Sequence, residues 1–251
     1  MLYLETPWAG VSDLSPCLIR LEGLQDPALN AFVQNSHEEW GYLLFSNAER
    51  SELLNHLRWL LQVRHPLGEE MLLRIADPAV IHALLEQDEL QNTDITLLGP
   101  IELIVAPDKI NGLWHQHQAP AVPVNRSSSS IYQLSEEQLH RLGQVSFRNT
   151  LIDLDAHMRQ HFPDYQRSLN QPERWAHLKA LAERGYAQGF ESEYDLTLYA
   201  NIFGLLGDEA LSAHHDIAAL LADKNAGTPS QRIEQAADLA YARAQHVERT
   251  S

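Results

Sequence analysis

Residues 40–85 read WGYLLFSNAERSELLNHLRWLLQVRHPLGEEMLLRIADPAVIHALL, and LLGPIELI follows at residues 97–104. Short apolar runs alternate here with helix-forming segments and turns. Four runs in the first 106 residues have the length and β-branched content of buried strands: CLIRL (17–21), GYLLFS (41–46), MLLRI (71–75) and IELIVA (101–106). This alternation predicts an α/β lobe, with a mixed sheet, flanking helices and crossover connections.

Two helices are predicted between these strands. The first runs from Asn47 to Gln62, and Ser46 and Glu49 have the spacing of a capping box at its start. One apolar stripe follows its axis: Leu53, Leu54, Leu57, Leu60 and Leu61. The second helix begins at Pro78, the favoured first helical position, behind Asp77 as the N-cap. We expect it to bury Val80, Ile81, Leu84 and Leu85.

The chain changes character near residue 125. Residues 107–134 contain three prolines and a run of four serines, which predicts a long linker or a mobile surface loop. Ser135 and Gln138 then form a capping box, and the pattern beyond them is helical. We therefore expect an α/β domain at residues 1–125 and an all-α lobe at residues 126–251. The helices expected in that lobe span about 136–162, 172–188, 192–206, 214–223 and 230–247.

The composition excludes several classes of function. A net charge of −16 argues against binding to nucleic acid or to anionic membrane surfaces, because both need clustered cations. Cys17 is the only cysteine, so no intrachain disulfide forms, and we expect it to be a small buried apolar residue. No apolar run reaches the length of a membrane span, and the N-terminus lacks the pattern of a signal peptide. These features predict a soluble, cytoplasmic protein.

Thirteen histidines raise the question of a metal site. His115 and His117 form an H-x-H pair, and the alternative to a zinc corner is a polar loop, which we favour. Asp153, His157 and His161 recur every four residues along one helix face. A solvated stripe explains that spacing as well as a metal-dependent hydrolase does. No serine-hydrolase elbow or glycine-rich phosphate loop is present, so we predict no catalytic, cofactor or metal residues.

Several arginines lie on consecutive predicted elements. Arg74 lies within an apolar run, which predicts that it is half-buried and paired with Asp77. An anion-binding pocket that includes Arg58 and Arg64 is the alternative, and a structural ion pair is the interpretation we favour.

The order of these motifs resembles the effector adaptors or chaperones of the bacterial type VI secretion system, long catalogued as a domain of unknown function. The resemblance covers about residues 3–106, and TPWAGVSDLSPCLIRL (6–21) is similar to the family's Pro-Trp segment. RGYAQGFESEYDLTLYANIFGLLG (184–207) resembles its helical C-terminal lobe. The matching positions are His56, Leu57, Arg58, Pro66, Gly68, Leu72, Arg74, Asp77, Pro78, Gly99 and Pro100.

Two departures from the family pattern accompany this resemblance. Family members usually have another strand and helix before the Pro-Trp segment, so we expect either a truncated chain or a short form, in which the sheet has an exposed edge. Ile75, Ala76 and Ala79 also stand where the family has an aromatic pair and an arginine.

The resemblance implies a non-enzymatic role, in which the protein binds a toxic effector and helps to load it onto the VgrG spike. Trp114, Tyr132, Trp175 and Tyr186 are then natural anchors for a partner, and a packed core position is an equal alternative for Trp175 and Tyr186. Two alternatives come from other classes. One is the metal-dependent hydrolase, and the other is an immunity-type protein that neutralises a basic toxin through its acidic surface.

Overall fold

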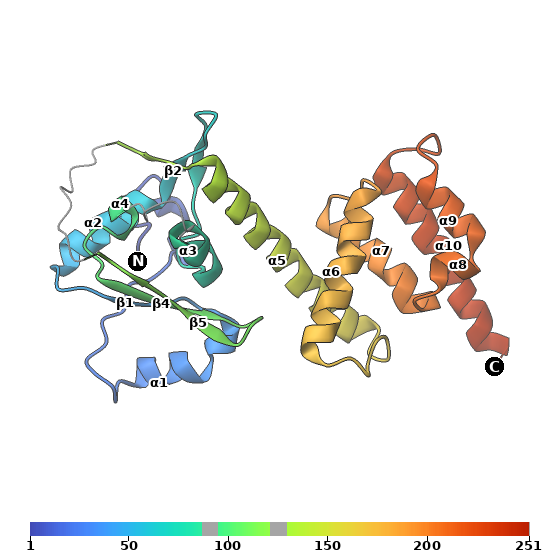
Figure 1. Cartoon of the computed structure of the whole chain (residues 1–251), viewed down its shortest axis with the longest axis horizontal. Coiled ribbons are helices and arrows are strands. Elements are labelled where there is room, and N and C mark those ends of the chain that lie inside the picture. The colour runs from blue at the N-terminus through green and yellow to red at the C-terminus, as the bar shows by residue number, and fades with distance from the viewer. Residues whose placement is uncertain (87–94, 121–129, 251) are drawn as a thin grey trace. The chain divides into compact units, whose positions relative to one another are not determined.

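The computed structural model describes residues 1–86, 95–120 and 130–250 (Figure 1). The chain forms two compact units, Met1–Val145 and Ser146–Ser251. The units divide within helix α5 (Glu136–His161), whereas the composition placed the boundary at residue 125. The reason is packing, because Leu142 and Val145 in the first turns of α5 contact the N-terminal core. The predicted class, an α/β part followed by a helical part, is confirmed.

The strands of the first unit form two small sheets. The first sheet has the order β1 (Leu43–Phe45), β4 (Leu103–Asp108), β5 (Leu113–Gln118), and both pairings are antiparallel. The second has the order β3 (Glu70–Leu72), β2 (Gln62–Arg64), β6 (Tyr132–Gln133), with β2 and β6 parallel. The connection from β2 to its parallel partner β6 is a crossover. The chain passes through β4 and β5 of the first sheet before β6 pairs with β2.

Three strand predictions are confirmed with changed bounds, and three other expectations for this unit are wrong: the strand at 17–21, the burial of Cys17 and the linker at 107–134. Residues 17–21 form no strand, and both Ile19 and Cys17 are exposed. Residues 107–134 include β5 and β6, so the segment is not simply a linker. Strand β5 escaped prediction because its sequence, LWHQHQ, ends in four consecutive polar residues and so lacks both the apolar run and the alternation that indicate a strand. Most of the predicted serine-rich stretch lies outside the described residues.

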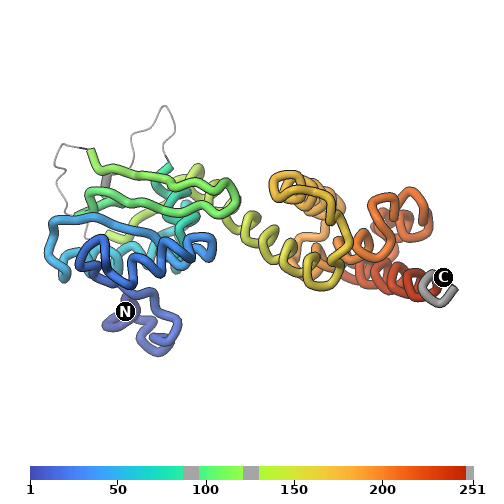
Figure 2. The backbone as a smooth tube through the Cα atoms, turned by 90° about the horizontal axis from the view of Figure 1, so that it is seen from below, coloured from blue at the N-terminus to red at the C-terminus, as the bar shows by residue number. Residues whose placement is uncertain are grey.

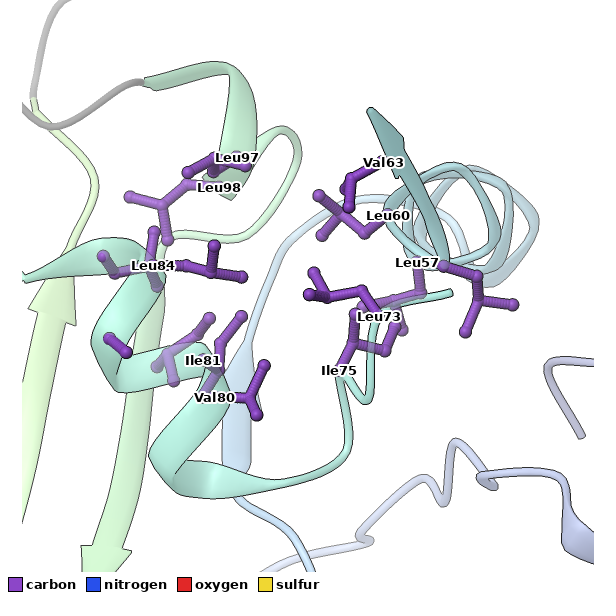
Figure 3. Close-up of a cluster of buried hydrophobic side chains, with 14 of the residues drawn as sticks. Leu57, Leu60, Val63, Leu73, Ile75, Val80, Ile81, Leu84, Leu97 and Leu98 are labelled. Carbon is purple, nitrogen blue, oxygen red and sulfur yellow. The ribbon is translucent and has the colours of Figure 1, made fainter. Parts of the chain in front are cut away.

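Three helices of the first unit pack around one apolar core: α2 (Arg50–Leu60), α3 (Pro78–Leu85) and α4 (Ile95–Leu98). Helix α1 (Pro27–Gln34) buries none of its residues, and short 3-10 turns lie at Ala9–Leu14 and Ser36–Glu38. Figure 3 shows Val80, Ile81 and Leu84 of α3 directed toward apolar side chains of the α2–β2 and α4 segments. The expected burial of α3 is confirmed, since six of its eight residues are buried.

Local capping signals have mixed outcomes. The Asp77 carboxylate accepts a hydrogen bond from the Ala79 N–H at 3.0 Å, which confirms the predicted N-cap of α3. The predicted capping box of α2 is wrong, because Glu49 is the N-cap and makes no side-chain cap. Ser46 Oγ donates instead to the Pro100 carbonyl at 2.6 Å. The hydroxyl therefore joins the end of β1 to the turn that precedes β4.

The second unit is helical, as predicted. It contains the later turns of α5 and five further helices: α6 (Gln171–Ala187), α7 (Glu193–Leu206), α8 (Ala210–Ala213), α9 (His215–Ala222) and α10 (Pro229–Thr250). At the start of α5 the capping box of Ser135 and Gln138 is confirmed by reciprocal hydrogen bonds of 3.0 and 3.1 Å. Gly207 ends α7 with a φ of 81°, a conformation that favours glycine. Among the described residues, no helix is both long and apolar enough to cross a membrane.

A buried ion pair lies inside the second unit. The Arg174 side chain is only 7% exposed, and its guanidinium donates to the Asp155 carboxylate and to the Tyr165 carbonyl. A charge in this position needs its partner, because the protein interior does not solvate it.

We predict that Asp155→Ala lowers the free energy of unfolding by about 3 kcal/mol, because it leaves a buried guanidinium without its carboxylate. Asp164→Ala removes a fully solvated carboxylate that pairs with Arg167 and serves as the control. Urea unfolding checks both variants. Equal, small losses in the two would contradict the assignment.

Gly99 has a φ of +54°, and a Cβ added at this position would overlap the His56 ring. Gly99→Ala should lower the free energy of unfolding by about 3 kcal/mol, since the overlap adds to the conformational cost. Gly112 has a similar φ of +65° but open space around it, so Gly112→Ala should cost only about 1 kcal/mol. Adding His56→Ala to the Gly99→Ala variant should remove the extra loss in thermal unfolding, and no such recovery would refute the overlap.

Candidate functional site

The family-motif residues lie where separate segments of the first unit meet. His56 Nε2 is 2.9 Å from the Leu97 carbonyl, and its ring lies against Gly99. Arg58 donates to the Leu2 carbonyl at 3.2 Å and to the Glu5 carboxylate at 2.8 Å. These contacts join α2 to the N-terminal segment and to the Gly99-Pro100 turn. The polar groups of His56 and Arg58 are therefore bonded to other segments of the same unit.

The predicted ion pair between Arg74 and Asp77 is present, with 3.5 Å between its closest atoms. The expected half-burial of Arg74 is wrong, because its side chain is 75% exposed. The reason is that β3 ends at Leu72, so Arg74 falls in the turn before α3 and not inside a strand. Arg64 pairs separately with Glu70 at 3.6 Å, and these contacts assemble no common anion pocket.

A cluster of three histidines lies between α3 and the first sheet. His115 and His117 alternate along β5 on the side that faces the core, where His82 of α3 meets them. His82 Nδ1 is 3.0 Å from His117 Nε2. The rings of His82 and His115 are stacked, with 3.6 Å between their centroids and an interplanar angle of 12°. Asp108 accepts a hydrogen bond from His115 Nε2 at 3.2 Å. The H-x-H pair is therefore part of a strand and not of a polar loop.

Burial controls the charge state of this cluster. Desolvation, assisted by the neighbouring imidazoles of His82 and His115, lowers the pKa of His117 to about 4. Desolvation is also the main cause that lowers the pKa of His82, and the His115 charge adds to it. Glu86 and Asp108 oppose the shift of His82, whereas Arg141 adds to it. At neutral pH both His82 and His117 are therefore uncharged.

The geometry of the cluster differs from that of a metal centre. Lone pairs of an imidazole lie in the ring plane, so two stacked, nearly parallel rings do not direct nitrogens at one ion. Asp153, His157 and His161 lie along α5 as predicted, but His157 Nε2 is 2.7 Å from the Asn201 amide oxygen. Within the described parts of the chain, no group of three His, Cys, Asp or Glu side chains is placed to hold a metal ion.

The four aromatic residues proposed as anchors lie in different surroundings. Trp114 is 39% exposed on β5 and contacts Phe32 of α1 edge-to-face at 5.9 Å. Tyr132 is partly buried, packs against Trp59, and its hydroxyl hydrogen-bonds with the Gln138 amide. Trp175 and Tyr186 are partly buried in the second unit, where both pack on a small cluster around Leu151 and Leu196. Of the four, Trp114 presents the most accessible ring.

Sequence reasoning placed His115 and His117 on one side but missed His82. The alternation of the pair was a sufficient signal for a shared face, because side chains two apart on a strand point the same way. No local signal links His82 to them. That contact depends on how α3 packs across the sheet.

Comparison with known proteins gives two matches. The family described as a domain of unknown function, DUF4123, matches residues 1–94. The chain is also 30% identical over 250 residues to the accessory protein VasW of Vibrio cholerae serotype O1. That alignment covers 97% of this chain and 79% of the Vibrio protein. No solved structure matches the chain at a significant level.

The histidine cluster makes stability depend on pH. His117 binds its proton at about pH 4 in the folded state but near pH 6.5 when unfolded, so the unfolded state binds more protons between these values. Stability is therefore complete above pH 6.5 and falls as the pH drops toward 4. We expect a loss of about 1–2 kcal/mol from His117 after allowance for partial solvent screening.

Urea unfolding at a series of pH values measures this loss, and His117→Asn isolates it from the titration of carboxylates. The variant should lose less stability than the parent between pH 6.5 and 4. His140→Asn, at an exposed position on α5, is the matched control and should behave as the parent. Parallel pH profiles for the parent and His117→Asn would contradict the burial of a neutral imidazole.

Proposed function

The chain belongs to the DUF4123 family, and from this premise we propose that it is an adaptor or chaperone. In this proposal it binds a type VI secretion effector and promotes the loading of that effector onto the VgrG spike. The observation that carries the proposal is the similarity to an accessory protein along 97% of the chain. Both units take part in that similarity, so the proposed role belongs to the whole chain. The family membership also confirms the resemblance seen in the sequence.

The proposed role is non-enzymatic. An adaptor needs stable surfaces, and each unit supplies a core of its own to support one. The acidic balance of the chain fits a protein partner and not nucleic acid or an anionic membrane. We place the binding step in the cytoplasm, before secretion.

The acidic charge also favours one alternative, an immunity-type protein that binds a basic toxin. Residues 1–145 carry 19 Asp and Glu against 8 Lys and Arg. An interaction that depends mainly on this charge weakens steeply with salt, whereas an interface with an apolar centre is retained. Salt dependence of the complex therefore separates the two functions.

The adaptor role predicts a stable complex with an effector encoded nearby. We expect a tagged chain to retain that effector, together with its spike protein, on affinity purification from secreting cells. Deletion of the chain should abolish secretion of this effector and leave other effectors unaffected. Retention should persist at about 0.5 M salt, where the Debye length is only a few ångströms. Absence of any effector in the purified material would refute the proposal.

The anchor residues give a sharper prediction. Trp114→Ala should weaken the complex roughly tenfold or more, because its 39% exposed ring is open to a partner, and loss of the Phe32 contact should cost only a modest part of the stability. Tyr132→Ala should instead lower the melting temperature, since it removes the Trp59 contact and the Gln138 hydrogen bond. Thermal unfolding and quantitative retention of the effector are measured on both variants. Full retention by Trp114→Ala would remove this residue from the proposed interface.

A further inference from the structure

The outward side of the first sheet is apolar along two of its three strands. The register places six apolar side chains on the side opposite the core. Pro107 is buried, and we call the other five the outer sheet face: Leu43, Phe45, Leu103, Val105 and Trp114. An antiparallel sheet that faces water on one side normally carries polar residues there. Only Gln116 and Gln118 of β5 follow that rule, and Phe45 is 49% exposed.

Helix α1 leaves most of this face open. It has eight residues and a length of roughly 12 Å, whereas six-residue β4 extends roughly 20 Å. Figure 2 looks onto the side of the sheet where α1 lies, and α1 runs alongside β1 there without crossing β4 and β5. None of its residues is buried, although Phe32 reaches Trp114. The helix therefore forms a border of the face and not a cover.

The segments that form and border the outer sheet face are strongly acidic. Residues 21–49 and 101–118 together contain seven Asp and Glu and a single Lys or Arg. That one cation, Lys109, is 4.0 Å from the Glu39 carboxylate. Glu38, in the turn that follows α1, is exposed. The combination of an apolar centre and an acidic surround selects for a partner with the opposite charge.

We propose that the outer sheet face is a docking site for an amphipathic helix of a partner protein, with apolar residues on one side and Lys or Arg at its flanks. The helix lies beside α1, spans Phe45 to Trp114 and completes a helical layer on this side of the sheet. The identity of that partner as a secretion effector or spike protein rests on the proposed function. The outer sheet face itself follows from the strand register and the exposure of its side chains, whatever the partner is.

Two other occupants fit the observations less well. A second copy of the chain would bring two acidic surfaces together, and like charges in contact oppose association. An added strand would pair with the backbone of β1 or β5 at the sheet edge, and it would leave the outer side chains uncovered. A basic helix buries those side chains and neutralises the carboxylates at the same time.

The test uses the full chain and a fluorescent peptide of about 18 residues, roughly 27 Å as a helix, made of Leu and Lys. Its leucines recur every three or four positions, so they form one stripe. A second peptide has the same composition with the leucines scattered around the helix. Fluorescence anisotropy gives the affinity of each peptide, and circular dichroism reports the helix formed on binding.

Four variants accompany the parent chain. Phe45→Gln should weaken binding of the striped peptide by roughly tenfold. Leu67→Gln changes an 84% exposed leucine on the β2–β3 turn and should leave binding unchanged. Gln116 is exposed on the same side as Val105 and offers a matched charge pair. Gln116→Lys should weaken binding several-fold, and Gln116→Glu should strengthen it.

Helix formation, preference for the striped peptide and this order of variants together support the docking site. Equal binding of both peptides, or equal effects of Phe45→Gln and Leu67→Gln, would overturn it. Self-association of the parent that Phe45→Gln abolishes would assign the face to a second copy and also overturn it. Because Gln116 is exposed, its two variants test the face even if Phe45→Gln fails to fold.

The effector complex separates this inference from the proposed function. If the tagged chain retains an effector that Phe45→Gln and Gln116→Lys do not release, the docking site is wrong and the adaptor role stands. If no effector is retained and the striped peptide still binds with the expected order of variants, the adaptor role fails and the docking site stands.

Discussion

Helix α3 buries six of its eight residues, and the arrangement of the first unit follows from this burial. A helix that is apolar on nearly all sides must have a neighbour on each side, because every uncovered face exposes apolar area to water. The inner side of the β1–β4–β5 sheet covers one side with Ile104 and Ala106. The α2–β2 segment and helix α4, with Leu97 and Leu98, cover the others (Figure 3). Two small sheets, in place of one wide sheet, are the consequence.

The polar residues of the unit take their roles from this packing. His82 is only partly buried on α3, and it meets the two histidines of β5 across the core side of the sheet. His56, Arg58 and Ser46 lie at the borders of the same core, where each bonds to a backbone carbonyl of a distant segment. Their chemistry is used to hold segments together. This agrees with a protein whose proposed work is done by surfaces and not by a reaction.

The two sides of the first sheet differ for the same reason. Helix α3 covers the inner side of the sheet, whereas the outer side has only the short, uncharged helix α1 at its border. The second unit has its own internal polar networks, of which Arg174 with Asp155 and Tyr165 with His177 and Asp208 are the clearest. These networks link helices to the segments between them and orient their packing.

The sequence by itself determined the features in which both partners lie within a few residues. Asp77 before Pro78 and Ser135 with Gln138 were predicted because an N-cap bonds to the backbone of the first turn of its own helix. The apolar stripe of α2 and the helical character of the second unit followed from periodicity in the same way. The family resemblance used the spacing of such local motifs, and the family match confirmed it.

Only the tertiary structure decided the contacts between distant segments. Ser46 has the spacing of a cap, yet it bonds to Pro100, since a nearby carbonyl from the turn before β4 competes with the helix end. Strand β5 has little apolar character of its own and exists because β4 pairs with it. The histidine cluster, the exposure of Arg74 and the open outer side of the sheet depend equally on how the elements pack. Such contacts leave no periodic signal in the chain, because they join residues that local spacing does not relate.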